Sequence, residues 1–274
     1  MLEVDRIIRN ALQEDIGLGD VTTLATVDRG VAARAELVAK EDFVLAGIDI
    51  AAQVFRTLDP AVAFEAISRD GQPVRRGDVL AWLKGEAALL LQGERVALNL
   101  LQRMCGIATL TARFVKEVEG TPAIIVDTRK TTPGLRVLEK YAVRMGGGRN
   151  HRTSLFDGVL IKENHVAAAG GIAKAVSRAR RYAPHTLRIE VETRDLQEVG
   201  EALESGADII LLDNLEPELL RQAVELVNRR ALTEASGGVT LESVGEIART
   251  GVDYISVGAL THSSRAVDIS MLFR

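Results

Sequence analysis

The period of hydrophobic and polar positions changes near residue 120. Before that point the patterns are mixed. They predict an amphipathic helix over 1–15, strands over 31–39 and 62–68, a helix over 48–58, two short strands within 71–86 and a long helix over 88–118. Gly93 and Gly106 lie inside the long helix, where glycine breaks a helix or allows close packing. This half of the chain is predicted to form an α+β layer.

After residue 120, short apolar runs alternate regularly with amphipathic helical patterns. Strands are predicted at 123–126, 158–161, 187–191, 208–212, 231–235 and 253–257, and helices at 135–145, 171–182, 195–205, 217–227 and 241–250. This alternation predicts parallel βαβ units. The last four strands begin 21 to 23 residues apart, an even spacing that favours a barrel over an open sheet. Six strands are identified, fewer than a complete barrel needs.

Composition narrows the class of protein. The 274 residues include 34 Lys+Arg and 38 Asp+Glu, a net charge of −4, and 47% are hydrophobic, enough for the core of one large domain or two modest ones. The acidic balance argues against a protein that coats nucleic acid. Cys105 is the single cysteine, and its apolar neighbours predict a buried structural thiol. No secretory signal or membrane span is expected, so a cytoplasmic location is the default.

Polar or glycine residues lie at or directly after the ends of all six predicted strands. They are residues 127–130, 162–165, Glu190 with Glu192, Asp213 with Asn214, 236–238, and Gly258. In a βα barrel the chemistry gathers at the C-terminal ends of the strands. The ordinary polarity of loops explains one or two of these ends, but not Lys162 and Glu192 at the edge of apolar strands. The pattern therefore predicts an active site at this end.

Positive charge is concentrated in residues 127–165. Eight Lys and Arg face four Asp and Glu there, a net +4, so the rest of the chain carries −8. Arg136, Lys140 and Arg144 are spaced as on one solvated helix face. The cations in or beside strand ends do not fit that explanation, and their convergence predicts a pocket for a multiply anionic ligand. They are Arg129, Lys130, Arg152 and Lys162.

Small residues follow the last two strands, at 236–238 and at Gly258. Each alone could be a tight turn. Together they favour a phosphate site, because backbone N–H groups and a following helix N-terminus bind phosphate and barrels often place it there. Glu192 and Asp213 could accept hydrogen bonds from sugar hydroxyls or face a divalent cation. The simplest ligands are a polyacid beside a phosphorylated, pyrophosphorylated sugar.

Longer strings resemble the quinolinate phosphoribosyltransferase family. They are EDIGLGDVTT, RVALNLLQRMCGIAT, DTRKTTPGLRVLEKYAVRMGGGRNHRTSLFDGVLIKENH, IEVE, LLDN, EASGGV and ISVGALTHS, in order over nearly the whole chain. The resemblance implies an N-terminal α/β sandwich at 1–105, which residues 265–274 can join. It also implies an incomplete, about seven-stranded α/β barrel of the type II phosphoribosyltransferases at 106–264, in a homodimer or higher oligomer. The implied reaction converts quinolinate and phosphoribosyl pyrophosphate to nicotinate mononucleotide, pyrophosphate and CO2, with Mg²⁺.

The resemblance also implies residue roles. Quinolinate would be bound by Arg129, His151, Arg152 and Lys162, with Arg95 contributed by the partner subunit. Phosphoribosyl pyrophosphate would be bound by Lys130, Glu192, Asp213, Ser236, Gly237, Gly258 and His262. The implied catalytic residues are Lys130, Lys162, Glu192 and Asp213. Mg²⁺ is expected to bind through pyrophosphate and water, without a direct protein ligand.

Two alternatives remain open at this point. One is a paralogue of the same fold associated with molybdenum transport operons, against which the intact GGGRNHR string at 146–152 argues. The other is a non-catalytic binding module, because residues 71–86 resemble the hammerhead of biotinyl and lipoyl domains. Lys84 lacks the flanking residues that such a domain needs.

Overall fold

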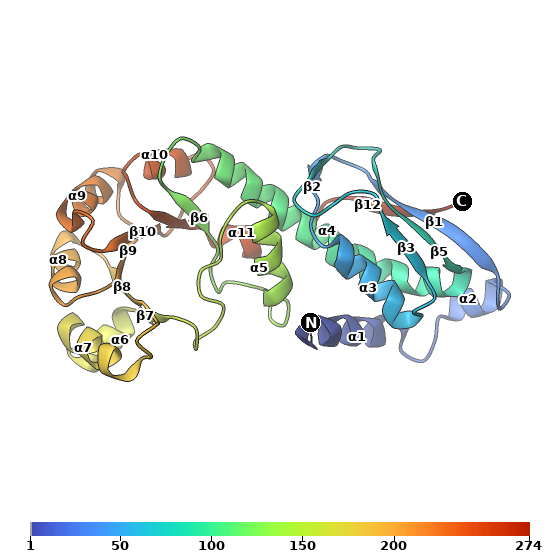
Figure 1. Ribbon diagram of the computed structural model, residues 1–274, viewed down its shortest axis with the longest axis horizontal. Helices are drawn as coiled ribbons and strands as arrows, with labels where there is room; N and C mark the ends of the chain where they lie inside the picture. Colours follow the sequence, from blue (N-terminus) through green and yellow to red (C-terminus); the bar gives the residue numbers. More distant parts are fainter. Residues whose placement is uncertain (1) are drawn as a thin grey trace. The chain divides into compact units, whose positions relative to one another are not determined.

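The computed structural model describes residues 2–274, and the chain divides into two units (Figure 1). Unit 1 comprises Met1–Ala112, Thr131–Gly147 and Ser263–Arg274, and unit 2 comprises Arg113–Lys130 and Gly148–His262. The chain therefore leaves unit 2 after Lys130 and returns to it at Gly148.

Unit 1 is built on an antiparallel sheet with strand order β12-β1-β5-β3. Its strands are β1 (Ala32–Ala39), β3 (Ala63–Ala66), β5 (Val79–Glu86) and β12 (Ile269–Phe273), and a small second sheet pairs β2 (Phe43–Val44) with β4 (Pro73–Val74). The helices are α1 (Leu2–Ile16), α2 (Val21–Thr26), α3 (Ile48–Leu58), α4 (Ala87–Glu117, whose end lies in unit 2) and α5 (Arg136–Met145). Because β12 pairs with β1, the C-terminal strand completes the N-terminal sheet.

The two glycines of α4 allow close packing and do not break the helix. A Cβ on Gly93 would lie 2.8 Å from the Phe55 ring, and one on Gly106 would lie 1.9 Å from the Arg265 carbonyl oxygen. Neither approach is open to a larger residue. Cys105 beside them is buried, as predicted, and burial raises the pKa of its thiol to about 12.

Unit 2 is built on a parallel sheet with strand order β6-β11-β10-β9-β8-β7. The strands are β6 (Ile124–Val126), β7 (Val159–Ile161), β8 (Ile189–Thr193), β9 (Ile209–Asp213), β10 (Leu232–Ser236) and β11 (Tyr254–Ser256). The helices are α6 (Glu163–Ala169), α7 (Ile172–Tyr182), α8 (Leu196–Glu204), α9 (Pro217–Val227), α10 (Val244–Ala248) and α11 (Ala259–His262). Figure 1 shows α8, α9 and α10 on the outer side of the curved sheet.

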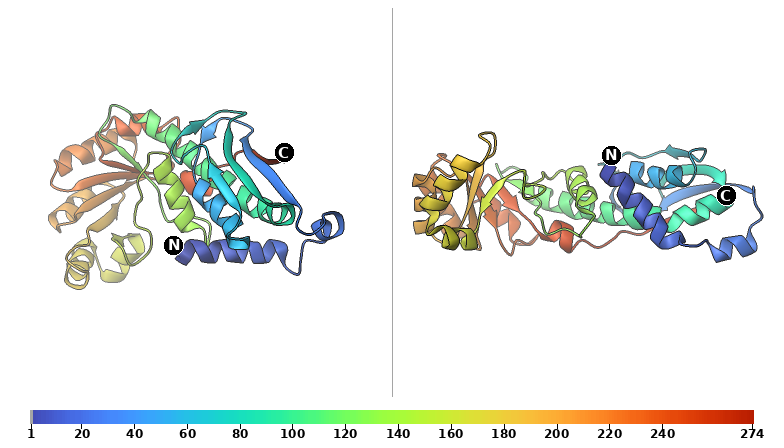
Figure 2. Two further views of the ribbon diagram at one scale, coloured as in Figure 1. Left: turned by 45° about the vertical axis from the view of Figure 1, so that its right-hand side comes forward. Right: turned by 90° about the horizontal axis from the view of Figure 1, so that it is seen from below.

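The barrel of unit 2 is incomplete, as predicted. A single parallel bridge joins Val126 to Arg149. At the position of a seventh strand beside β6, the chain therefore pairs through one residue only. Views from other directions show the same short parallel strands at the centre of this unit (Figure 2). Among residues 2–274, no helix is both long enough and apolar enough to cross a membrane.

Two sequence expectations need correction. Lys140 is only 3% exposed, so Arg136, Lys140 and Arg144 do not form a solvated helix face. The helix that carries them, α5, belongs to unit 1, although its position between two barrel strands suggested a barrel helix. Periodicity reports that one face of a helix is apolar, but not which core that face meets.

Candidate active site

Three predicted site residues share the inner face of the parallel sheet. Ser236 is paired with Asp213, and Glu192 is paired with Leu211, two positions before Asp213. Paired residues of parallel strands point to the same side, and every second residue shares a face. Glu192, Asp213 and Ser236 therefore lie together near the C-terminal ends of β8, β9 and β10, all of them partly exposed.

Lys162 is held at the same end by Glu192. The Lys162 Nζ lies 2.5 Å from Glu192 Oε2, and their side chains are 49% and 17% exposed. Lys162 comes directly before α6, where its backbone N–H donates to His165 Nδ1 at 2.9 Å. An anionic ligand that binds Lys162 has to compete with Glu192 for it.

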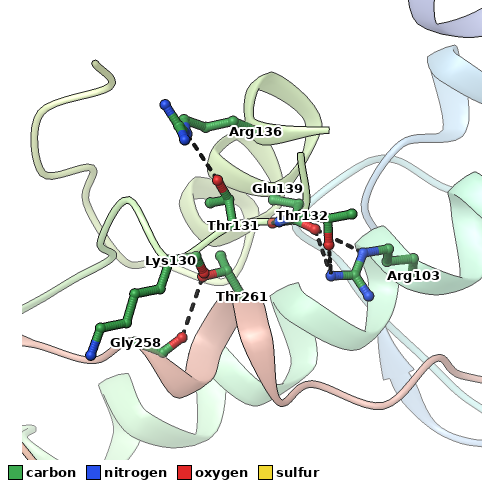
Figure 3. Close-up of polar contacts among 8 residues, drawn as sticks. All are labelled: Arg103, Lys130, Thr131, Thr132, Arg136, Glu139, Gly258 and Thr261. Atoms are coloured by element: carbon green, nitrogen blue, oxygen red, sulfur yellow. Dashed lines mark hydrogen bonds and ion pairs between the residues drawn. The ribbon is translucent and has the colours of Figure 1, made fainter. Parts of the chain in front are cut away.

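Gly258 brings Lys130 and His262 together. A Cβ on Gly258 would lie 3.1 Å from both the Lys130 Cδ and the His262 Nε2, so only glycine leaves this arrangement undisturbed. Thr261 holds the neighbouring loop, because its hydroxyl donates to the Lys130 carbonyl at 2.7 Å (Figure 3). Thr261 is fully buried and was not predicted as a site residue, although it lies inside the ISVGALTHS string.

The loop after β10 depends on two glycines with left-handed backbone. Gly237 has φ +94° and Gly238 has φ +59°. A Cβ on Gly237 would lie 2.2 Å from the Asn214 Oδ1. The sequence suggested that a helix N-terminus follows directly, but α10 starts only at Val244. A phosphate bound here would meet loop N–H groups and not a helix end.

Arg152 lies in the electrostatic field of a second arginine in unit 2. Burial and the charge of Arg129 both lower the pKa of Arg152 below its ordinary value. Arg152 is also fixed by a 3.1 Å hydrogen bond from its Nη1 to the Gly158 carbonyl. Partial burial together with a like charge nearby is typical of a site that binds an anion.

His151 lies over an unexpected group of buried acids. Its Nε2 is 3.0 Å from Glu190 Oε2 and 3.7 Å from Glu234 Oε1, while its Nδ1 accepts the Arg152 backbone N–H at 2.7 Å. The fully buried Asp127 accepts the His151 backbone N–H at 2.9 Å. Asp127 and Glu190 were predicted only as polar residues at strand ends, without a role in the site, and Glu234 was not predicted. The signal in the sequence was an acid at an inward position of β8 and β10 and another directly after β6.

A cavity of about 390 Å³ inside the barrel is lined by His151, Arg152, Glu190 and Glu234, and it extends to Asp157 before β7 and Arg188 before β8. A larger cavity of about 1110 Å³ lies among the loops that precede β8–β11 and is lined by residues such as Arg188 and Arg229. Chemistry in βα barrels occurs at the opposite, C-terminal ends of the strands, so the larger cavity is not the candidate active site.

The predicted residues divide between the units. Arg95 lies exposed on α4 in unit 1. All the others lie in unit 2, at or after the C-terminal ends of its strands, in the segment that contains Arg152 or, for His262, at the end of α11.

The comparison with known families decides the class of protein. The N-terminal domain of quinolinate phosphoribosyl transferase matches residues 20–105, and its C-terminal domain matches residues 107–272. The chain belongs to the quinolinate phosphoribosyltransferase family. The family resemblance and the fold class that the sequence predicted are therefore confirmed.

Relatives of this phosphoribosyltransferase chain match it along nearly its full length. A probable nicotinate-nucleotide pyrophosphorylase [carboxylating] of Bacillus subtilis is 47% identical over 270 residues, which cover 98% of this chain and 93% of the relative. A chloroplastic nicotinate-nucleotide pyrophosphorylase [carboxylating] of Arabidopsis thaliana is 45% identical, with 98% and 82% covered.

Solved structures agree with this assignment. NadC from Streptococcus pyogenes superposes with a TM-score of 0.95 at 41% identity, covering 99% of this chain and 96% of that one. The nicotinate-nucleotide pyrophosphorylase from Francisella tularensis superposes with a TM-score of 0.93 at 39% identity, with the same coverage.

Proposed function

We infer that this chain transfers the phosphoribosyl group of phosphoribosyl pyrophosphate to quinolinate with loss of CO2. The products are nicotinate mononucleotide and pyrophosphate, and the step belongs to NAD biosynthesis. Relatives that are 44 to 47% identical carry the names of this activity. The structural observation that carries the inference is Arg152, fixed by its hydrogen bond to the Gly158 carbonyl in a cavity that it shares with His151, in a barrel that also has a glycine loop after β10.

Charge repulsion is the first problem that this reaction has to overcome. Quinolinate brings two negative charges and the pyrophosphorylated sugar brings several more, so the two substrates repel each other in the absence of cations. We assign Arg129, Arg152 and Lys162 to the quinolinate carboxylates, with His151 in the same set. Arginine offers two parallel donors to a carboxylate, which also orients the ring.

The second problem is the transfer itself. The ring nitrogen attacks the anomeric carbon while the bond from that carbon to the pyrophosphate oxygen breaks, and positive charge develops on the sugar. Glu192 and Asp213 would stabilise that charge beside the ribose hydroxyls. Lys130 and His262 would face the departing pyrophosphate, and Ser236, Gly237 and Gly258 would hold the 5-phosphate. This is electrostatic catalysis by groups already in position.

The ion pair between Lys162 and Glu192 suggests how binding prepares the site. Without ligand, the two side chains neutralise each other at 2.5 Å. A quinolinate carboxylate that draws Lys162 away leaves Glu192 charged and available to the ribose. Binding of quinolinate would then release the Glu192 carboxylate from Lys162, so that it can stabilise the positive charge on the sugar during the transfer.

The last step is loss of the 2-carboxylate. Once the ring nitrogen is alkylated, it stabilises the electron pair that remains on the adjacent carbon when CO2 departs. That carbon then takes up one proton. No lysine Schiff base is required.

Mg²⁺ is proposed as the accompanying ion. The partly exposed Asp213 carboxylate is an oxygen donor, which suits a cation that keeps most of its water. Asp213 would reach the ion through water, and pyrophosphate oxygens would bind it directly. When bound, the ion neutralises charge on the leaving pyrophosphate.

We further propose a cytoplasmic homodimer or higher oligomer in which Arg95 of one subunit completes the site of the other. Its partners are then the two small-molecule substrates and a second copy of the chain, with neither nucleic acid nor membrane. Arg95 is suited to this role because it is exposed on α4.

The deciding experiment is an assay of nicotinate mononucleotide formation. Purified protein is incubated with quinolinate, phosphoribosyl pyrophosphate and Mg²⁺, and the expected result is product and CO2 in equal amounts, lost on chelation of the ion. Calorimetric titration should detect binding of quinolinate but not of nicotinate, which lacks the 2-carboxylate. Product formation from nicotinate in place of quinolinate would overturn the proposal.

A further inference from the structure

The barrel of unit 2 encloses two carboxylic acids for which the reaction above has no use. Glu190 on β8 is 4% exposed and Glu234 on β10 is 3% exposed. The Oε1 atom of each is buried and accepts no hydrogen bond from residues 2–274. A buried carboxylate is costly unless it is paired or protonated, so this pair calls for a physical explanation.

His151 connects the acids to the anion pocket. Its Nδ1 accepts the Arg152 N–H at 2.7 Å, so the ring proton resides on Nε2. Nε2 is 3.0 Å from Glu190 and 3.7 Å from Glu234, so that proton points at the acids. One nitrogen of the ring therefore orients the Arg152 backbone while the other is held by the acid pair.

A metal ion is the competing explanation for this cluster. One ligand atom from each of His151, Glu190 and Glu234 lies within 4.8 Å of the other two, which is close enough to surround an ion. A nitrogen that keeps its proton cannot bind a metal, however, and Nδ1 already accepts a hydrogen bond. The geometry favours a shared proton.

The surroundings of Glu234 are mixed in charge. Burial and the charge of Glu190 raise the pKa of Glu234 to about 7, while His151 and Ser256 act in the opposite direction. The titratable and charged groups that face the pair from the surrounding elements are Asp127 after β6, His151 and Arg152, Asp157 before β7, Arg188 before β8, and Tyr254 on β11. Glu234 is thus mostly protonated at pH 6 and loses its proton as the pH rises through about 7.

We propose that Glu190 and Glu234 are positioning residues that share a proton with His151 and, through it, fix Arg152 at the quinolinate pocket. This inference rests on the proposed function, because it takes Arg152 to bind the dicarboxylate. Removal of the shared proton places a second negative charge next to the quinolinate pocket. It also weakens the contacts between the His151 ring and the two acids. The affinity for a dianion then falls.

The first test measures KM for quinolinate and kcat from pH 6 to pH 9. In the unaltered enzyme, KM is expected to rise on the order of tenfold above pH 7, since one charge corresponds to about one pKa unit of interaction. Glu234→Gln keeps the neutral form at every pH, so its KM should stay flat while kcat changes less than about twofold. Glu190→Gln removes the charge that opposes ionisation of Glu234. In this variant the rise in KM for quinolinate should therefore begin at lower pH.

Glu225→Gln is the matched control, because Glu225 is an exposed carboxylate of the same unit. Its KM profile should follow that of the unaltered enzyme. A Glu234→Gln profile that also follows it would overturn the proposal.

A second measurement does not depend on activity. ¹⁵N NMR of histidine-labelled protein without substrate should show His151 with its proton on Nε2, and with a changed signal in Glu190→Gln. A proton on Nδ1, or stoichiometric Zn²⁺ or Mn²⁺ binding that Glu234→Gln abolishes, would overturn the proposal. If the unaltered protein does not convert quinolinate at all, the proposed function fails, while the NMR spectrum still decides how His151 is held.

Discussion

The Arg152 side chain is charged, partly buried, and fixed by its own hydrogen bond to the Gly158 carbonyl. We expect Arg152→Ala to lower turnover of quinolinate by on the order of 10²-fold or more, as the loss of a preorganised donor does in other active sites. Steady-state kinetics would measure this. Arg178→Ala removes an exposed arginine of the same unit and should leave turnover unchanged. Near-normal turnover of Arg152→Ala would contradict the assignment of this residue.

Gly237 offers a test of the phosphate loop. Alanine there is strained by φ +94° and meets the Asn214 side chain at 2.2 Å, so Gly237→Ala should raise KM for phosphoribosyl pyrophosphate and lower the melting temperature. Gly200→Ala is the matched control, because nothing lies within 4 Å of a Cβ there in the middle of α8. It should stabilise the protein by about 0.5–1 kcal/mol. Equal effects of the two substitutions would contradict this account of the loop.

The raised pKa of Glu234 predicts how stability depends on pH. Its pKa is about 7 in the folded protein against an ordinary 4.5, so the folded state binds more protons than the unfolded state between these values. The contribution of Glu234 to stability therefore falls as pH rises through this window, by about 3 kcal/mol in all. Glu234→Gln should match the unaltered protein in urea unfolding at pH 5 and exceed its stability at pH 8. A difference that is the same at both pH values would contradict the prediction.

The sequence predicted which polar residues lie at the strand ends, but not which side chains contact one another there. Lys162 and Glu192 stood out because they interrupt the ends of apolar strands, yet 30 positions separate them, and only the register of β7 and β8 brings them together. Glu190 received no role and Glu234 was not predicted, because a single acid inside an apolar strand does not reveal which face it occupies or what lies opposite. Their pairing depends on a barrel that curves β8 and β10 around His151.

At the scale of elements, α5 is held to α4 by an ion pair between a buried carboxylate and a partly exposed arginine. Arg103 Nε donates to Glu139 Oε1 at 2.8 Å, and the Thr132 N–H donates to Glu139 Oε2 at 3.1 Å (Figure 3). The Glu139 side chain is 1% exposed. This contact also fixes the chain two residues after Lys130, so it supports the loop that carries that lysine.

We therefore expect Glu139→Gln to lower the free energy of unfolding by about 2 kcal/mol, because it weakens the charge-assisted hydrogen bonds between a buried carboxylate and the partly exposed Arg103. Glu218→Gln breaks an exposed ion pair with Arg221 on α9 and should cost less than about 0.5 kcal/mol. Urea unfolding of both variants would measure the contrast. Similar losses from the two would contradict the role of burial.

Local periodicity predicted most elements to within a few residues, including α3 at 48–58 and α9 at 217–227. It missed the short elements α2, β2, α6 and α11, and it missed β12. A two-residue strand or a four-residue helix spans only about one period of its pattern, so no repeat can be recognised. The strand β12 could not be anticipated from pattern alone, because its place in the sheet depends on pairing with β1, more than 200 residues earlier.

For the whole molecule, the average charge is a poor guide to the ligand. A net charge of −4 argues against nucleic acid, but it conceals the +4 of residues 127–165. The structure divides even that segment between the two units, so Arg129, Arg152 and Lys162 lie in unit 2 while Arg136, Lys140 and Arg144 lie in unit 1. Only part of the positive charge is therefore available to the barrel.

The proposed sharing of Arg95 between subunits can be tested in dimers that combine two different inactive variants. Arg95→Ala and Arg152→Ala damage different units, and each should be nearly inactive alone. If each site takes Arg95 from the partner, a mixed dimer has one doubly damaged site and one intact site. Equal amounts, mixed after reversible dissociation, should then recover about a quarter of full activity, since about half of the dimers are mixed and half of their sites are whole. If each chain instead supplied its own Arg95, every site would keep one defect, and mixing would restore nothing.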